Sequence, residues 1–139
     1  MVVDKKNQVR LFEKTKVRTF WDEENQKWWF SVIDIVAILT EQTNYTKVRN
    51  YWKWLKNKLK SEGSELVSNT NQLKLVAEDG KYYKTDVLDT EQILRLIQSI
   101  PSKKAEPFKM WLAKVGRERI DEIEMLKNQI NFLHTKIIT

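Results

Sequence analysis

The first third of the chain alternates apolar and polar positions in short runs. Residues 8–13 and 15–21 mix β-branched and aromatic residues with polar ones, and residues 27–31 do the same after a polar turn at 22–26. Runs of this kind are typical of strands. We therefore predict a small antiparallel sheet over residues 8–31.

The segment 31–63 is predicted to form two helices. Ser31 is suited to be an N-cap, with Asp34 three residues later in a capping-box-like role. The helix that it opens, VIDIVAILT, is apolar almost all round, so we expect it to be buried. After a polar break at 42–44, a basic helix ends near residues 61–63. A buried helix, a short break and a basic amphipathic helix have the layout of a helix-turn-helix unit.

The chain then returns to strand-like runs. QLKLVA and KYYKT flank the polar residues 78–80, which end in Asp-Gly. Asp-Gly between two such runs is a good hairpin signal, so we predict a hairpin over residues 72–85.

Helical patterns fill the rest of the chain. Asp89 is suited to cap the helix TEQILRLIQS, which Pro101 ends. A further helix begins near residue 102 or 107 and extends to the end, with Gly116 as a candidate interruption. The whole pattern predicts an α+β fold: a small antiparallel sheet and a hairpin, with a helix-turn-helix-like pair and C-terminal helices.

The composition fits one compact domain. The chain has 139 residues, of which 41% are apolar, so a real core can form. It contains no Cys, which removes disulfides and thiolate metal sites and fits a reducing compartment. No apolar run approaches the roughly 20 residues of a membrane span, and the first ten residues lack the apolar segment of a signal peptide. We therefore expect an intracellular protein without a membrane partner.

The net charge of the chain, +6, sits in one segment. Residues 44–60, NYTKVRNYWKWLKNKLK, contain six Lys or Arg, four aromatic residues and no acidic residue. The basic and acidic residues elsewhere balance. Charge concentrated in this way makes a local positive field, which is the form that polyanion binding takes.

A helical projection of residues 45–60 separates two stripes, each about 60° wide. The expected core stripe consists of Val48, Trp52, Leu55 and Leu59. The basic stripe consists of Arg49, Lys53, Lys56 and Lys60. Lys47 and Lys58 lie on the other flank, with Trp54 between them.

The basic stripe has two interpretations. It is either an ordinary solvated helix face or a surface that holds a polyanion. Arg49/Lys53 and Lys56/Lys60 are like-charge i,i+4 pairs with no acidic neighbour in the segment, and such pairs cost a few tenths of a kcal/mol each. An external anion would relieve this repulsion, which favours the second interpretation. The Trp54 ring either stacks on a base or sugar, or packs on a neighbouring strand.

The sequence contains few residues that suggest catalysis. His134 has no partner motif, and no Gly-rich phosphate loop is present. Asp86, Asp89 and Glu91 could be imagined as a magnesium site, but they precede an apolar helical run and are better explained as N-terminal caps with favourable dipole charges. We expect no enzyme activity, no cofactor and no metal.

The C-terminal helix carries an apolar stripe with 3-4-3-4 spacing. Its members are Ile123, Leu126, Ile130, Leu133 and Ile137. This is the seam of a short coiled coil, so we predict a homodimer; the alternative is that the stripe packs on its own domain.

Two longer segments resemble a known family. Residues 79–123, DGKYYKTDVLDTEQILRLIQSIPSKKAEPFKMWLAKVGRERIDEI, are similar to the Bro-N domain of BRO-family proteins and prophage antirepressors. Residues 21–41, WDEENQKWWFSVIDIVAILTE, resemble the first half of the same domain. The resemblance implies a Bro-N-like DNA-binding domain at 1–125, with a C-terminal helical extension at 126–139. It also implies a phage or prophage protein that acts in the cytoplasm of a bacterial host.

The leading hypothesis is a regulatory protein that binds duplex DNA. The DNA-binding residues would be Tyr45, Thr46, Lys47, Arg49, Lys53, Trp54, Lys56 and Lys60. The hairpin residues Lys74, Lys81 and Lys84 could act as a wing. The alternative is a protein-interaction module that captures a repressor, or another acidic partner, without specific DNA binding.

Overall fold

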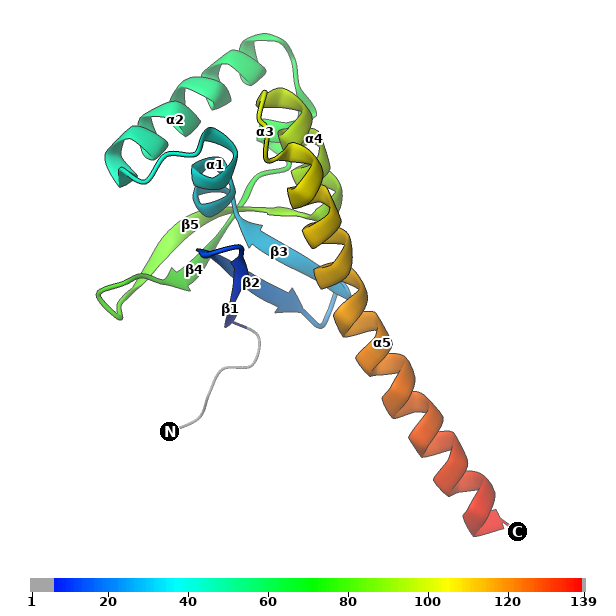
Figure 1. Ribbon diagram of the computed structural model, residues 1–139. Helices are drawn as coiled ribbons and strands as arrows, with labels where there is room; N and C mark the ends of the chain where they lie inside the picture. Colours follow the sequence, from blue (N-terminus) through cyan, green and yellow to red (C-terminus); the bar gives the residue numbers. More distant parts are fainter. Residues whose placement is uncertain (1–6, 139) are drawn as a thin grey trace.

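The N-terminal strands form the predicted antiparallel meander. A computed structural model describes residues 7–138 of the chain, and within them the side chains of 119–124, 126 and 132–138 are not described. Strands β1 (Asn7–Phe12), β2 (Thr15–Asp22) and β3 (Lys27–Ser31) follow one another (Figure 1). Each pairs with the next in antiparallel register.

Two helices joined by a short turn come next, as predicted. Ser31 accepts a hydrogen bond from the backbone N–H of Asp34 and caps α1 (Val32–Thr40). Glu41 ends this helix in the left-handed conformation, and Asn44 caps α2 (Tyr45–Ser61) by accepting from the Lys47 N–H. The short helix α3 (Glu65–Ser68) follows.

The predicted hairpin belongs to the same sheet as the N-terminal strands. Strands β4 (Asn71–Val76) and β5 (Tyr82–Asp89) pair with each other, and β5 also pairs with β3. The sheet therefore has five strands, all antiparallel, in the order β1-β2-β3-β5-β4. This joining is what makes the fold a single α+β unit, because it places all the helices around one sheet.

The helices cover one face of the sheet. Alternate strand residues point towards them and form the core with α1, α2, α4 and α5; these strand residues are Phe12, Val17, Trp21, Trp28, Phe30 and Leu88. Trp52 of α2 is buried as predicted. Trp111 of α5 is only half-buried, because its ring lies at the edge of this core, where its Nε1 donates to the Leu11 carbonyl at 2.8 Å.

The sheet is strongly curled. Arg18 of β2 donates from Nη1 to the Val76 carbonyl of β4 at 3.2 Å, although β3 and β5 lie between these strands in the sheet order. The same guanidinium bonds both carboxylate oxygens of Asp34 in α1, at 2.9 and 3.0 Å. The face opposite the helices is therefore concave, and it buries Leu75 and Val87 away from the main core.

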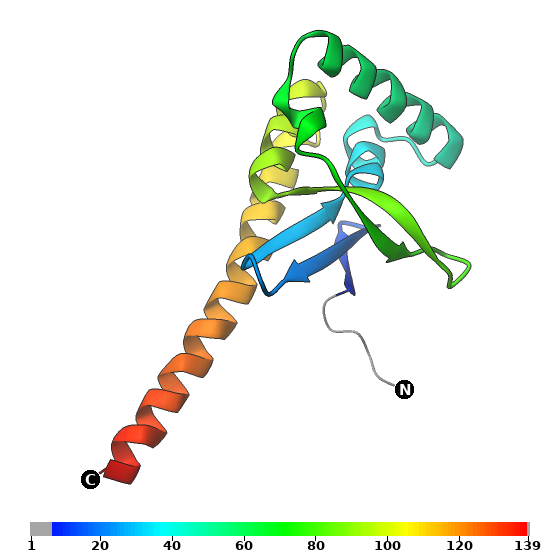
Figure 2. The same ribbon diagram turned by 180° about the vertical axis from the view of Figure 1, so that it is seen from behind.

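The last two helices are α4 (Thr90–Ser99) and α5 (Ala105–Ile138). Asp89 caps α4 by accepting from the Gln92 N–H at 3.0 Å, as predicted. Gly116 does not interrupt α5, so the prediction of a break there is wrong; the helical hydrogen bonds need no side chain at that position. The second half of α5 projects beyond the domain in both views (Figures 1 and 2).

The predicted coiled-coil seam falls on this projecting part. The side chains of Ile123, Leu126, Leu133 and Ile137 lie outside the described residues. Ile130 is described and is 64% exposed. The homodimer stays a prediction.

Candidate nucleic-acid interface

Helix α2 separates an apolar face from a basic one. Val48, Trp52, Leu55 and Leu59 are buried, as the helical projection predicts. They pack in the core, and α1 lies against α2. This packing fixes the rotation of the helix, so Arg49, Lys53 and Lys60 of the neighbouring basic stripe face solvent.

The outward side of α2 is densely basic. The exposed cations are Lys47, Arg49, Lys53, Lys58 and Lys60. Within the part of the chain that the structure describes, none of these five forms an ion pair with a carboxylate. Two of them instead lie over aromatic rings of the same helix, with Arg49 at 5.7 Å from the Tyr45 centroid and Lys58 at 5.3 Å from that of Trp54. Their positive charges are therefore available to an external anion.

Lys56 differs from the other members of the basic stripe. Its Nζ lies 3.0 Å from Oδ2 of Asp86 on β5, and the same oxygen accepts from the buried Nε1 of Trp52 at 2.8 Å. The expectation that no acidic residue offsets the repulsion between Lys56 and Lys60 is therefore wrong, because the tertiary fold brings Asp86 to Lys56. A lysine held in this way is a weaker candidate for a phosphate contact than Lys53.

Asp86 is the polar centre between α2 and the sheet. Burial raises the pKa of its carboxyl, but hydrogen bonds from Trp52, Gln72 and Lys56 outweigh burial, so the pKa lies below its ordinary value. Gln72 of β4 supplies one of these bonds, at 3.0 Å. The carboxylate thus stays ionised at neutral pH and ties α2 to β4 and β5.

Trp54 is exposed on the outward side of α2. Its side chain is 54% exposed, and its ring tilts against Tyr51 with centroids 5.6 Å apart. The described ring contacts of Trp54 are thus to Tyr51 and Lys58 of its own helix rather than to a strand. This geometry leaves the indole open to a stacking partner.

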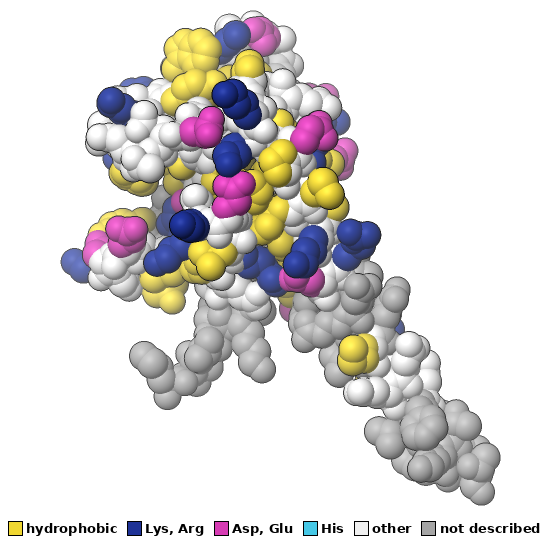
Figure 3. Space-filling view, viewed as in Figure 1, with side chains coloured by type: hydrophobic (Ala, Val, Ile, Leu, Met, Phe, Trp, Pro, Cys, Tyr) yellow, Lys and Arg dark blue, Asp and Glu magenta, His cyan; other side chains and the backbone are white. Residues whose placement is uncertain are grey.

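The hairpin lysines face the same side as α2. Lys74 and Lys84 are exposed and oppose each other across β4 and β5, two residues from Gln72 and Asp86. Because side chains two residues apart share a face of a strand, both lysines point to the side on which Asp86 meets α2. Lys81 is exposed near the tip. Figure 3 shows Lys and Arg side chains over both α2 and the hairpin.

Sequence reasoning missed one residue of this surface. Tyr82 is 55% exposed at the start of β5, and it alternates with Lys84 on the same face. An exposed aromatic ring between basic side chains is a signal that the sequence could have offered, since KYYK stands in a strand-like run. Whether Tyr82 belongs to the basic surface could not be predicted from the sequence, because that depends on how β5 pairs with its neighbours.

The acidic residues 86–91 do not converge on one point. Asp86 bonds α2, Asp89 caps α4 and pairs with Lys27, and Glu91 lies 3.8 Å from Arg95. Among the described residues, no three His, Asp or Glu side chains gather in a way that could hold a metal ion. The described helices also include none that is long and apolar enough to cross a membrane.

The architecture defines a class: an α+β domain in which a basic amphipathic helix and a basic hairpin flank one side of a curled antiparallel sheet. Residues 16–118 match the model of the BRO family, N-terminal domain. The chain therefore belongs to the BRO family, as the resemblance in its sequence indicated. No curated protein and no solved structure matches the chain.

Proposed function

We propose that this protein is a DNA-binding regulator of the antirepressor type. The observation that carries the proposal is the outward side of α2, where Lys47, Arg49, Lys53 and Lys60 are exposed without a carboxylate partner among the described residues. Membership of the BRO family supports the same proposed function. The protein would act by binding rather than by catalysis, in the cytoplasm of a bacterial host.

The contacts follow from the chemistry of the surface. Lys and Arg on α2 would lie along phosphates and set the position of the domain on the duplex. Trp54, which is 54% exposed, would add a flat apolar contact to a sugar or base. Lys74 and Lys84 on the hairpin would reach a neighbouring stretch of backbone, because they face the same side as α2.

The test is salt-dependent binding to labelled duplexes of unrelated sequence, measured by fluorescence anisotropy. Arg49→Gln combined with Lys53→Gln removes two exposed cations. Each lost phosphate contact should flatten the slope of log affinity against log salt by about 0.9, so the double variant should lose roughly 1.8. The affinity should fall alike for all duplexes.

A matched control removes the same charge elsewhere. Lys114→Gln combined with Lys127→Gln changes two exposed lysines of α5, which projects away from α2. This variant should keep the wild-type slope. If both double variants flatten the salt slope equally, DNA binding depends on the net charge of the protein and not on α2. Binding to an acidic polypeptide but to no duplex would favour the protein-interaction module instead.

A further inference from the structure

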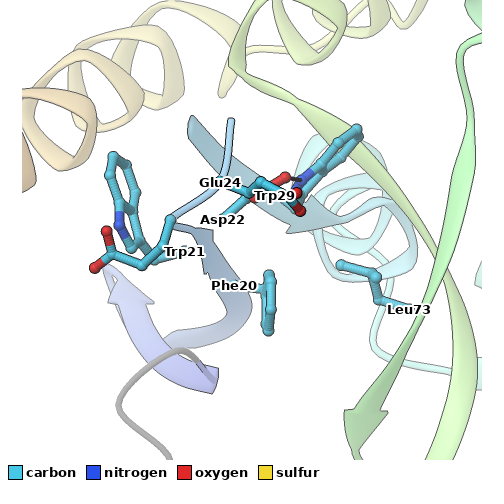
Figure 4. A pocket seen from close by; sticks show the side chains of 7 residues that line it. Phe20, Trp21, Asp22, Glu24, Trp29 and Leu73 are labelled. Carbon is cyan, nitrogen blue, oxygen red and sulfur yellow. Dashed lines mark hydrogen bonds between the residues drawn. The ribbon is translucent and has the colours of Figure 1, made fainter. Parts of the chain in front are cut away.

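The concave face of the sheet, opposite the helices, contains a hollow. Its volume is about 510 Å³, and its lining comes from β2, β3, the turn between them and β4. Figure 4 shows Phe20 and Leu73 pointing into the same space, while Trp21 turns to the other side of its strand. Trp29 lies at the edge of the hollow beside Asp22 and Glu24. The hollow is therefore apolar and aromatic at its floor.

One side of the hollow is acidic. Asp22, Glu23 and Glu24 are consecutive, and all three line it. Hydrogen bonds from the Asn25 side chain and backbone and from the Trp29 indole lower the pKa of Asp22 to about 2, so this carboxylate stays ionised. Lys27, which lies 4.5 Å from the Trp29 ring centroid, has its charge matched by Asp89 at 3.1 Å. Asp22 and Glu24 therefore give this side of the hollow negative charge.

An apolar floor with an acidic rim fits a large apolar side chain that lies among cations. Helix α2 presents this chemistry on the outside of the same protein: Trp54 is 54% exposed and Lys58 lies over its ring at 5.3 Å. All of the net charge of the chain lies in residues 44–60, so the two surfaces are complementary.

The two surfaces cannot meet within one molecule. Helix α2 bonds Asp86, which shares a face with Gln72, whereas the adjacent Leu73 points to the opposite face of the sheet. We propose that the hollow receives α2 of a second copy of the chain, with Trp54 inserted between Phe20, Trp29 and Leu73. The helix and the hollow are different surfaces, so the contact is head-to-tail, and it extends the assembly copy by copy unless the rotation between copies closes a ring.

This contact would also regulate the proposed function. A copy whose α2 is inserted in a neighbour covers Trp54, which is one of the proposed DNA contacts, so duplex DNA and self-association compete for this side chain. That consequence rests on the proposed DNA binding. The contact itself does not, and it can be tested without DNA.

The test is sedimentation velocity at low salt over a range of protein concentrations. The wild-type weight-average mass should rise steadily above the 16.7 kDa of one chain and fall back at 1 M salt, where the screening length is about 3 Å. Trp54→Asp removes the inserted ring, and Leu73→Lys blocks the floor. Because the predicted coiled coil of α5 would pair chains by a separate route, every protein in this test also carries Leu133→Asp. In this background, each variant alone should remain a monomer. Trp54 is exposed and Leu73 is on an edge strand, so both variants should fold, which circular dichroism checks.

Mixing the two variants gives the decisive result. Trp54→Asp keeps an intact hollow and Leu73→Lys keeps an intact helix, so an equimolar mixture should form a complex that stops at two chains. If Leu73→Lys fails to fold, Glu24→Lys in the exposed turn replaces it. A wild-type protein that stays monomeric overturns the proposal. So does self-association that survives both substitutions, or a mixture that forms no complex.

Discussion

Lys53 and Lys56 look alike in the sequence, but the structure predicts different effects for their replacement. Lys53 is exposed and has no carboxylate partner among the described residues. Lys56 pairs with Asp86 at 3.0 Å, and the two side chains are 35% and 16% exposed. We therefore expect Lys53→Gln to change DNA binding and Lys56→Gln to change mainly stability.

The magnitudes follow from the two environments. Losing one phosphate contact flattens the slope of log affinity against log salt by about 0.9. A fourfold rise in salt should therefore weaken DNA binding by Lys53→Gln about 3.5-fold less than it weakens DNA binding by the wild type. The Lys56–Asp86 pair is partly exposed, and solvent screening limits its value to about 0.5–1 kcal/mol. The Tm of Lys56→Gln should therefore fall by about 1–4 °C, and that of Lys53→Gln should stay unchanged.

The assays are anisotropy titrations at several salt concentrations and thermal unfolding by circular dichroism. Lys114→Gln serves as the control for charge removal, because Lys114 is exposed on α5. The reasoning is refuted if Lys56→Gln flattens the slope as much as Lys53→Gln and leaves Tm unchanged. That result would mean that Lys56 leaves Asp86 for a phosphate at no cost to the fold.

Two further predictions concern stability. The pKa of Asp86 is lowered in the folded protein, so its ionised form contributes stability that is complete above the unfolded pKa of about 3.9 and is lost as pH falls through the folded pKa. The difference in urea stability between wild type and Asp86→Asn should therefore be largest at neutral pH and shrink below about pH 4; a constant difference down to pH 2.5 would contradict this account. Gly116→Ala should raise the free energy of unfolding by about 0.5–1 kcal/mol, since a Cβ there meets no atom within 4 Å in the middle of α5; a lower Tm would show that α5 is not continuous at this residue.

The sequence by itself determined the local structure. Ser31 and Asp89 were predictable as caps, because their side-chain oxygens can reach the unpaired N–H groups of the first helical turn. The buried stripe of α2 could be predicted as well, because helical geometry alone fixes which residues share a face. The alternation of the strands and the Asp-Gly turn are equally local signals.

Only the tertiary structure decided what these elements form together. The pairing of β3 with β5 joins segments that no local pattern connects, and it brings Asp86 to Lys56, thirty positions away. In the basic stripe, Lys56 is therefore ion-paired with Asp86, whereas Arg49, Lys53 and Lys60 are exposed. The same joining, with the curl held by Arg18, Asp34 and Val76, creates the hollow on the concave face. Such contacts depend on which hydrophobic faces pack together, and a single sequence does not encode that choice in any one segment.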